Sequence, residues 1–283
     1  MTKSQRISQD SSLGISVLLP TRGRKEQLLK SVSSLMETAA DNSNIEILFG
    51  FDNDDLDSID YFNKEIVPVL SNYGIHFKAL KFPPLGYPRL NEYVNKLAAY
   101  AKGRWLFFWN DDAKMETKEW DLEFYKWDGQ FRVLAVHTHN EHPYSIFPIV
   151  PVDWFKLLGY ISSHPLNDAE ISQIAYFLQL FQRIDVWVDH DRYDLTGNNH
   201  DSTYESRKLL EGNPNQEGDI AHINSRIRRY QMADRIAWFL KYQGISIKAW
   251  TDFLDGKRNP WEELLETDVN NQMHLQKVGV PRE

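Results

Sequence analysis

The sequence predicts an α/β fold: a mostly parallel central sheet that is flanked by helices and followed by a helical C-terminal extension. Three observations support this prediction. Short β-rich runs alternate with segments of helical periodicity through the first third of the chain. The run at residues 105–109 is entirely apolar, as expected of a strand buried on both faces. The most unusual polar residues directly follow the predicted strands, which is where open α/β sheets bind their ligands.

The elements of the first half follow one another without a long break. Strands are predicted at residues 15–19, 45–51, 75–80 and 105–109, and helices at residues 24–40, 59–70 and 89–101. Pro20 ends the first strand, and Gly103 ends the third helix. Such an alternation of strands and helices predicts a parallel sheet covered by helices on both sides.

The pattern loosens in the second half. Strands are predicted at residues 133–138, 145–150 and 184–188, helices at 168–183 and 218–242, and a long polar loop at 189–202. We expect a flexible N-terminus at residues 1–13, a catalytic domain at residues 14–205 and a mainly helical extension, packed on the core, at residues 206–283.

Composition excludes several classes of function. The chain of 283 residues has 32 Lys and Arg against 40 Asp and Glu, a net charge of −8, which argues against nucleic-acid binding. It has no cysteine, so neither disulfides nor thiolate metal sites are possible, and a cytoplasmic location fits this. The polar start lacks the apolar centre of a signal peptide, and no apolar run is long enough to span a bilayer.

An acidic turn, Asn110-Asp111-Asp112, closes the apolar run at residues 105–109. Hard divalent cations such as Mg²⁺ or Mn²⁺ bind through one or two carboxylates together with substrate phosphates, so this turn is a candidate metal-diphosphate site. The alternative is that Asp111 and Asp112 only cap the next turn. Asp52, which follows the second strand, is expected to lie nearby and favours the functional interpretation.

Three motifs resemble the GT-A fold of nucleotide-sugar-dependent glycosyltransferases, especially the family-2-like group. They are the Pro20-Thr21-Arg22-Gly23-Arg24 segment, Asp52, and the succession from Asn91 through Gly103 to Asn110-Asp111-Asp112. The resemblance covers residues 14–200 and implies a metal-dependent transfer of a sugar from a nucleoside diphosphate donor, a UDP-sugar, to a glycan or other hydroxyl acceptor. The implied cofactor is Mn²⁺ or Mg²⁺.

The resemblance also assigns roles within the acidic turn. Asn110 stands where the usual DxD motif begins with an aspartate. By this alignment Asp112 is the metal ligand, and Asp111 faces the sugar or the ribose.

The other predicted strand ends supply candidates for binding the nucleotide. The first predicted strand ends at the N-terminus of the first helix, where backbone donors would contact the nucleotide. The residues at this point are Pro20, Thr21, Arg22 and Arg24, and arginine contacts phosphate bidentately. Asp52 is expected to accept a hydrogen bond from the base or the ribose. Neither a Walker A loop nor a dinucleotide-binding glycine motif is present.

Arg89 and Asn91 open the third predicted helix after a glycine-containing loop. They are candidates for contacting the nucleotide, with ordinary helix capping as the alternative.

In the second half, the resemblance places the catalytic base of inverting members near the start of a helix, a position held by Asp168, with Glu170 as the alternative. A retaining reaction would leave Asp168 without that role, and the sequence does not decide between the two. A base must come within about 3 Å of the acceptor hydroxyl. Acidic residues are also favoured in any first helical turn, so the position alone does not assign the role. His190 follows the last predicted strand, where many metal-dependent GT-A enzymes supply an additional metal ligand.

Two alternatives from other functional classes remain open. His137, His139 and His142 could form a zinc site of a metal hydrolase, although the cluster is expected outside the crevice at the strand ends. The departure at Asn110 also leaves open a binding protein that retains the fold and binds nucleotide sugars or glycans without turnover. A nucleotidylyltransferase is disfavoured, because its glycine-rich basic start is missing.

Overall fold

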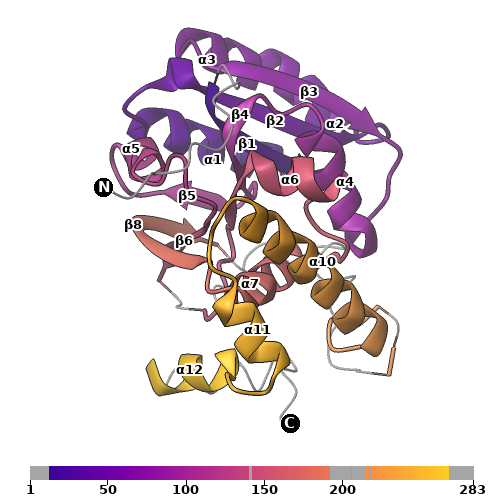
Figure 1. Cartoon of the computed structure of the whole chain (residues 1–283). Coiled ribbons are helices and arrows are strands. Elements are labelled where there is room, and N and C mark those ends of the chain that lie inside the picture. Colours follow the sequence, from indigo (N-terminus) through magenta and orange to yellow (C-terminus); the bar gives the residue numbers. More distant parts are fainter. Residues whose placement is uncertain (1–12, 140–141, 192–204, 206–214, 217, 268–283) are drawn as a thin grey trace.

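A computed structural model describes residues 13–139, 142–191, 205, 215–216 and 218–267. Its centre is one eight-stranded sheet with the order β3-β2-β1-β4-β7-β6-β8-β5 (Figure 1). The first four strands are β1 (Leu13–Thr21), β2 (Ile45–Asp52), β3 (His76–Phe82) and β4 (Gly103–Phe108). β1 pairs in parallel with β2 and with β4, and β2 with β3, as the strand-helix alternation predicted.

The second half of the sheet is mixed, so the sheet is mostly, as predicted, but not purely parallel. Its strands are β5 (Ala113–Met115), β6 (Val133–Thr138), β7 (Ile149–Pro151) and β8 (Phe181–His190). β6 and β8 are parallel, but β7 runs antiparallel to both β4 and β6, and β5 runs antiparallel to β8. β5 and β7 pair over only a few residues each, and such short strands carry too little periodicity for their direction to be predicted.

Helices cover both faces of the sheet. In the first half they are α1 (Lys25–Thr38), α2 (Leu56–Tyr61), a π-helical segment (Phe62–Ile66), α3 (Val67–Asn72) and α4 (Leu90–Ala98). In the second half they are α5 (Trp120–Tyr125), α6 (Val152–Leu158), α7 (Asn167–Phe177), α10 (Ile223–Tyr242), α11 (Lys248–Leu254) and α12 (Pro260–Thr267). Short 3₁₀ turns at Asn42–Asn44 and Tyr87–Arg89 precede β2 and α4.

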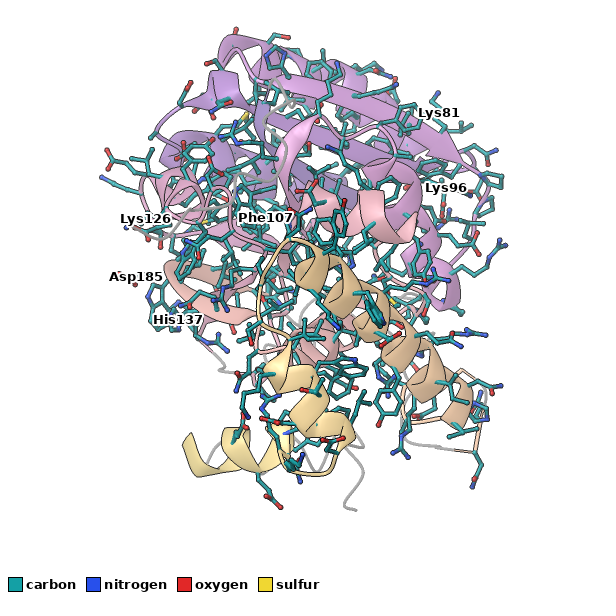
Figure 2. All side chains as sticks on the ribbon, viewed as in Figure 1. Lys81, Lys96, Phe107, Lys126, His137 and Asp185 are labelled. Atoms are coloured by element: carbon teal, nitrogen blue, oxygen red, sulfur yellow. The ribbon has the colours of Figure 1, made fainter. Side chains whose placement is uncertain are left out.

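Alternate residues of the strands face two separate hydrophobic cores. Ile15 and Val17 of β1 contact the core that α1, α2, α3 and α5 complete, and Phe107 of β4 belongs to it, in the interior of the molecule (Figure 2). Leu18 and Leu106 face the other core, formed with α4, α6, α7, α10 and α11. The two cores fix the sheet from both sides, so the carboxyl ends of its strands are held rigidly.

The C-terminal helices belong to the second of these cores. Met232, Ile236 and Leu240 of α10 and Trp250 of α11 are buried in it with residues of α6 and α7. The division into a flexible start, a catalytic domain and an extension stays a prediction, and residues 1–12 lie outside the described part. The helix predicted to reach residue 183 ends at Phe177, and the chain reverses at Gln179, whose φ is 53°, before β8 begins.

Within the described residues, none of the helices combines the length and the apolar character needed to cross a membrane. The cytoplasmic location stays a prediction.

Candidate active site

A cavity of about 260 Å³ opens at the carboxyl ends of β1, β2 and β4. Nine of the residues predicted to act at the site line it: Pro20, Thr21, Arg22, Arg24, Asp52, Asp111, Asp112, Asp168 and His190. The cavity therefore brings together residues from three strand ends of the first half and from two elements of the second half.

The acidic turn is fixed by the core beneath it. The Trp109 indole donates to the Ser31 hydroxyl at 2.7 Å, and that hydroxyl donates to the Asn110 carbonyl at 2.9 Å. The backbone N–H of Trp109 also donates to the Leu18 carbonyl at 3.0 Å. Because Trp109 is buried and Ser31 lies on α1, the turn cannot move without disturbing the packing of α1 against the sheet.

Asp111 is buried against two donors from the end of β1 and the start of α1. The Thr21 hydroxyl donates to its Oδ2 at 2.7 Å, and Arg24 Nη1 lies 3.1 Å from its Oδ1. The same nitrogen lies 2.9 Å from Asp112 Oδ2, so one guanidinium bridges both carboxylates. Burial raises the pKa of Asp111 to about 6, against the opposing effects of Arg24 and Thr21.

Asp112 and His190 meet because β5 and β8 pair. In this antiparallel pair Ala113 lies opposite His190, and the N–H of Asp191 donates to the Asp112 carbonyl at 3.1 Å. As a result, His190 Nε2 lies 3.1 Å from Asp112 Oδ1. Burial disfavours ionisation of Asp112, but the hydrogen bond and charge of His190 and the charge of Arg24 outweigh it and lower the pKa of Asp112.

The donor atoms of Asp112 and His190 fit a hard divalent cation. Two neighbouring ligands of an octahedral ion with bonds of about 2.1 Å stand about 3 Å apart, which is close to the observed 3.1 Å. Among the described residues, however, no group of three or more His, Cys, Asp or Glu side chains is placed to hold a metal. A cation at this point would thus have two side-chain ligands among the described residues, and its remaining positions would be filled by oxygens of a bound ligand and water.

Asp52 is held by protein groups on both of its oxygens. Tyr93 donates its hydroxyl to Oδ1, and Arg22 Nη1 lies 2.7 Å from Oδ2. The Tyr93 oxygen in turn accepts the N–H of Leu85 at 2.7 Å. Burial, followed by the hydrogen bond to Asp52, raises the pKa of Tyr93 to about 12, so this phenol stays a donor. Asp52 therefore organises Arg22 and Tyr93 on the cavity wall.

Tyr93 was not among the predicted site residues. In the sequence it stands beside Val94 in an amphipathic helix, so it is indistinguishable from a core position.

Arg89 and Asn91 do not line the cavity. Arg89 pairs with Glu92 on the surface, one turn along α4, through Nε and through a 2.7 Å contact from Nη2. The residues of this region that do line the cavity are Gly86, Tyr87 and Leu90.

The second half supplies the opposite wall. Because β7 runs antiparallel to β4, the residues before it return to the carboxyl end of β4, and His142, Ile146 and Pro148 reach the cavity. Asp168 lies on the same cavity, in the first turn of α7, and its side chain is half-buried.

Glu170, the alternative base, does not line the cavity. It is fully buried, and its carboxylate accepts from the Ser162 hydroxyl at 2.6 Å and from the N–H and hydroxyl of Ser163 at 2.7 and 2.6 Å. These bonds fasten the start of α7 to the preceding loop. Glu170 therefore has a structural role.

The three histidines do not form one cluster. His137 stacks on Trp187 with ring centroids 4.7 Å apart, at the sheet edge that also presents Asp185 (Figure 2). His139 contacts Glu116 at 2.8 Å. His142 instead lines the cavity, contrary to the prediction that it lies outside the crevice, and its Nδ1 accepts the N–H of Tyr144 at 3.2 Å.

No protein-family model matches this sequence, and no curated protein does. Solved structures do match. A mannosyltransferase from Pyrobaculum calidifontis, in complex with GDP-Man and Mn²⁺, superposes with a TM-score of 0.52 at 10% identity, over 98% of this chain and 90% of that one. S. aureus TarS 1-349 in complex with UDP-GlcNAc gives 0.48 at 14% identity, over 81% of this chain and 73% of that one. The predicted likeness is thus confirmed at the level of architecture: the chain has the fold of a GT-A type glycosyltransferase.

Proposed function

We propose that this chain is a glycosyltransferase that moves a sugar from a nucleoside diphosphate donor, a UDP-sugar, to the hydroxyl of a glycan or other acceptor. The observation that carries the proposal is the meeting of Asp112 and His190, from two distant strands, in the cavity that also holds Arg22 and Arg24. Two metal ligands and two arginines around one cavity match the charge of a diphosphate.

In this proposal Asp112 and His190 hold Mn²⁺ or Mg²⁺, which when bound neutralises the charge that develops on the departing diphosphate. Arg24 moves from the two carboxylates to a phosphate oxygen, and Arg22 contacts the nucleotide beside Thr21 and Pro20. Asp111, freed of Arg24, accepts a hydroxyl of the sugar or the ribose. The mannosyltransferase with this fold was solved with GDP-Man and Mn²⁺, which supports a nucleotide-sugar donor and a divalent ion here.

Asp168 is the proposed base of an inverting reaction. It lines the cavity from the first turn of α7, and it is the carboxylate that the second half contributes to the cavity wall. An ionised Asp168 would take the proton of the acceptor hydroxyl as the oxygen attacks the sugar carbon.

Calorimetry tests the donor and the metal together. The wild type is titrated with UDP and with GDP, each with and without Mn²⁺, and the titrations are repeated on Asp112→Ala. We expect Mn²⁺-dependent binding of UDP in the wild type and a loss of at least about tenfold in affinity in the variant. Asp60→Ala is the matched control, because Asp60 is an exposed acid that pairs with Lys64 far from the cavity.

Two outcomes would redirect the proposal. UDP binding that needs no metal and survives Asp112→Ala would contradict the metal assignment. Tighter binding of GDP than of UDP would show that the donor carries guanine in place of uracil. Release of UDP from donor sugars separates an enzyme from the alternative of a binding protein without turnover, which would bind the nucleotide and release none.

A further inference from the structure

Helix α10 exposes large apolar side chains on the face that points away from the protein. Its inner face is buried, with Met232, Ile236 and Leu240 in the core. On the outer side, Ile223, Ile227, Trp238 and Tyr242 are exposed by 57%, 45%, 59% and 89%. A helix at the surface of a globular protein normally carries polar residues at such positions.

These four residues form one stripe. Ile223 and Ile227 are one turn apart, as are Trp238 and Tyr242, and three turns separate Ile227 from Trp238, so all four project to the same side. From residue 223 to residue 242 the stripe is about 28 Å long at 1.5 Å per residue. α10 runs across the front of the molecule, and none of the other described elements passes over it (Figure 1).

The stripe is bordered by cations in a protein that is acidic overall. α10 contains Arg226, Arg228, Arg235 and Lys241, which are at least partly exposed, and the buried Arg229, against the single acid Asp234, although the chain carries a net charge of −8.

The exposed arginines of α10 are available for an external partner. Arg228 and Arg235 are exposed, two turns apart along the same edge of the stripe, and neither forms an ion pair with any described residue. Some other surface cations do have local partners, as Lys64 has in Asp60 and Lys257 in Asp255. The acid of the helix is engaged elsewhere, because Asp234 accepts the Trp250 indole N–H at 3.2 Å.

We infer that the outer face of α10 docks the protein on the surface of an anionic lipid bilayer. Helices that lie in a membrane interface combine exposed Trp, Tyr and aliphatic side chains with flanking Arg and Lys. Unpaired arginines beside the apolar stripe match anionic headgroups. A second copy fits less well, because a two-fold contact through this face would bring Arg228 and Arg235 against their own copies. The inference does not depend on the reaction proposed above.

Vesicle flotation tests it with the full-length chain. Vesicles of phosphatidylcholine alone are compared with vesicles that also contain phosphatidylglycerol. We expect binding to the anionic vesicles only, weakened by added salt, since exposed charges are screened. Arg228→Glu/Arg235→Glu and Trp238→Ser/Tyr242→Ser should each lower the bound fraction at least about tenfold.

Matched controls separate docking from misfolding and from the active site. Trp187→Ser removes an exposed aromatic of β8, and Lys64→Glu reverses a surface charge far from α10; both should bind vesicles like the wild type. Nucleotide binding should be unchanged in the α10 variants, because none of these residues lines the cavity. Failure to bind anionic vesicles, or equal binding by every variant, would overturn the inference. A dimer seen in sedimentation velocity that is lost in the Trp238 variant would replace the lipid surface with a second copy.

Discussion

The two halves of the sheet build their share of the site in different ways. In β1, β2 and β4 the chemistry-bearing residues follow the strands, so parallel pairing alone brings Thr21, Asp52 and Asp111 to one edge. In the second half, His142 reaches that edge because the chain after it returns in β7, antiparallel to β4, and His190 reaches it at the end of β8, which runs parallel to β6. The positions of the first-half residues can thus be predicted from strand order. The positions of the second-half residues depend on pairings between segments far apart in the chain.

The proposed division of labour follows this difference. The first half contributes the contacts expected for the nucleotide, and the second contributes the proposed base and one metal ligand. Substitutions in the first half should therefore change the affinity for the donor or the stability of the sheet. A substitution of Asp168 should change the rate of the chemical step.

Asp168→Asn gives the largest expected effect. Loss of a general base lowers kcat by about 100- to 10,000-fold, while UDP affinity measured by calorimetry stays within about twofold. Asp153→Asn is the control, because Asp153 is also a first-turn acid, on α6, but does not line the cavity. An unchanged kcat in Asp168→Asn would mean that the residue is not the base, as expected if the enzyme retains configuration.

Gly103→Ala tests how tightly the first half is built. A Cβ at this position would lie 2.4 Å from the Ser16 nitrogen and 2.6 Å from the Ile15 carbonyl carbon, both backbone atoms of β1. We expect the free energy of unfolding, measured with urea, to fall by about 1–3 kcal/mol or more. At Gly14 the added Cβ would meet the end of the Tyr125 side chain, which can move, so Gly14→Ala should cost less. A loss at Gly103 as small as that at Gly14 would show that β1 and β4 can move apart at little cost.

The pH dependence of donor binding reports on Asp111. Burial raises its pKa to about 6, so the carboxylate is ionised above that pH and protonated below it. The dissociation constant for UDP with Mn²⁺ should therefore rise as the pH falls through 6, by up to about tenfold for each pH unit. In Asp111→Asn this dependence should become weaker, and the part that remains would come from the deprotonation that His190 needs in order to bind Mn²⁺. A flat profile in the wild type would show that the ionisation of Asp111 does not contribute to binding.

Arg89→Ala should have the smallest effect, less than about twofold on UDP affinity, because Arg89 pairs with Glu92 outside the cavity. Arg22→Ala is the informative partner, since Arg22 lines the cavity and holds Asp52. A larger loss in Arg89→Ala than in Arg22→Ala would place the nucleotide on α4 and reverse this part of the proposal.

Sequence reasoning found the residues whose position follows from local rules. Asp52 and Asp111 could be placed because each follows an apolar strand, and parallel strands end at one edge. Tyr93 could not be found, because a helical tyrosine beside Val94 is typical of a core position and only the tertiary packing directs its hydroxyl to Asp52. His142 was misplaced because the direction of β7, a strand of three residues, is decided by its pairing with β4.

The contact between Asp112 and His190 also has a consequence for how the chain folds. The two residues are 78 positions apart, and the contact exists only once β8 has paired with β5. Closing so long a loop is entropically costly until the intervening helices have packed, so this pairing is expected late. During synthesis the proposed ion site would form only after residue 190 has left the ribosome, and the nascent chain would be unable to bind metal and donor until its sheet is complete.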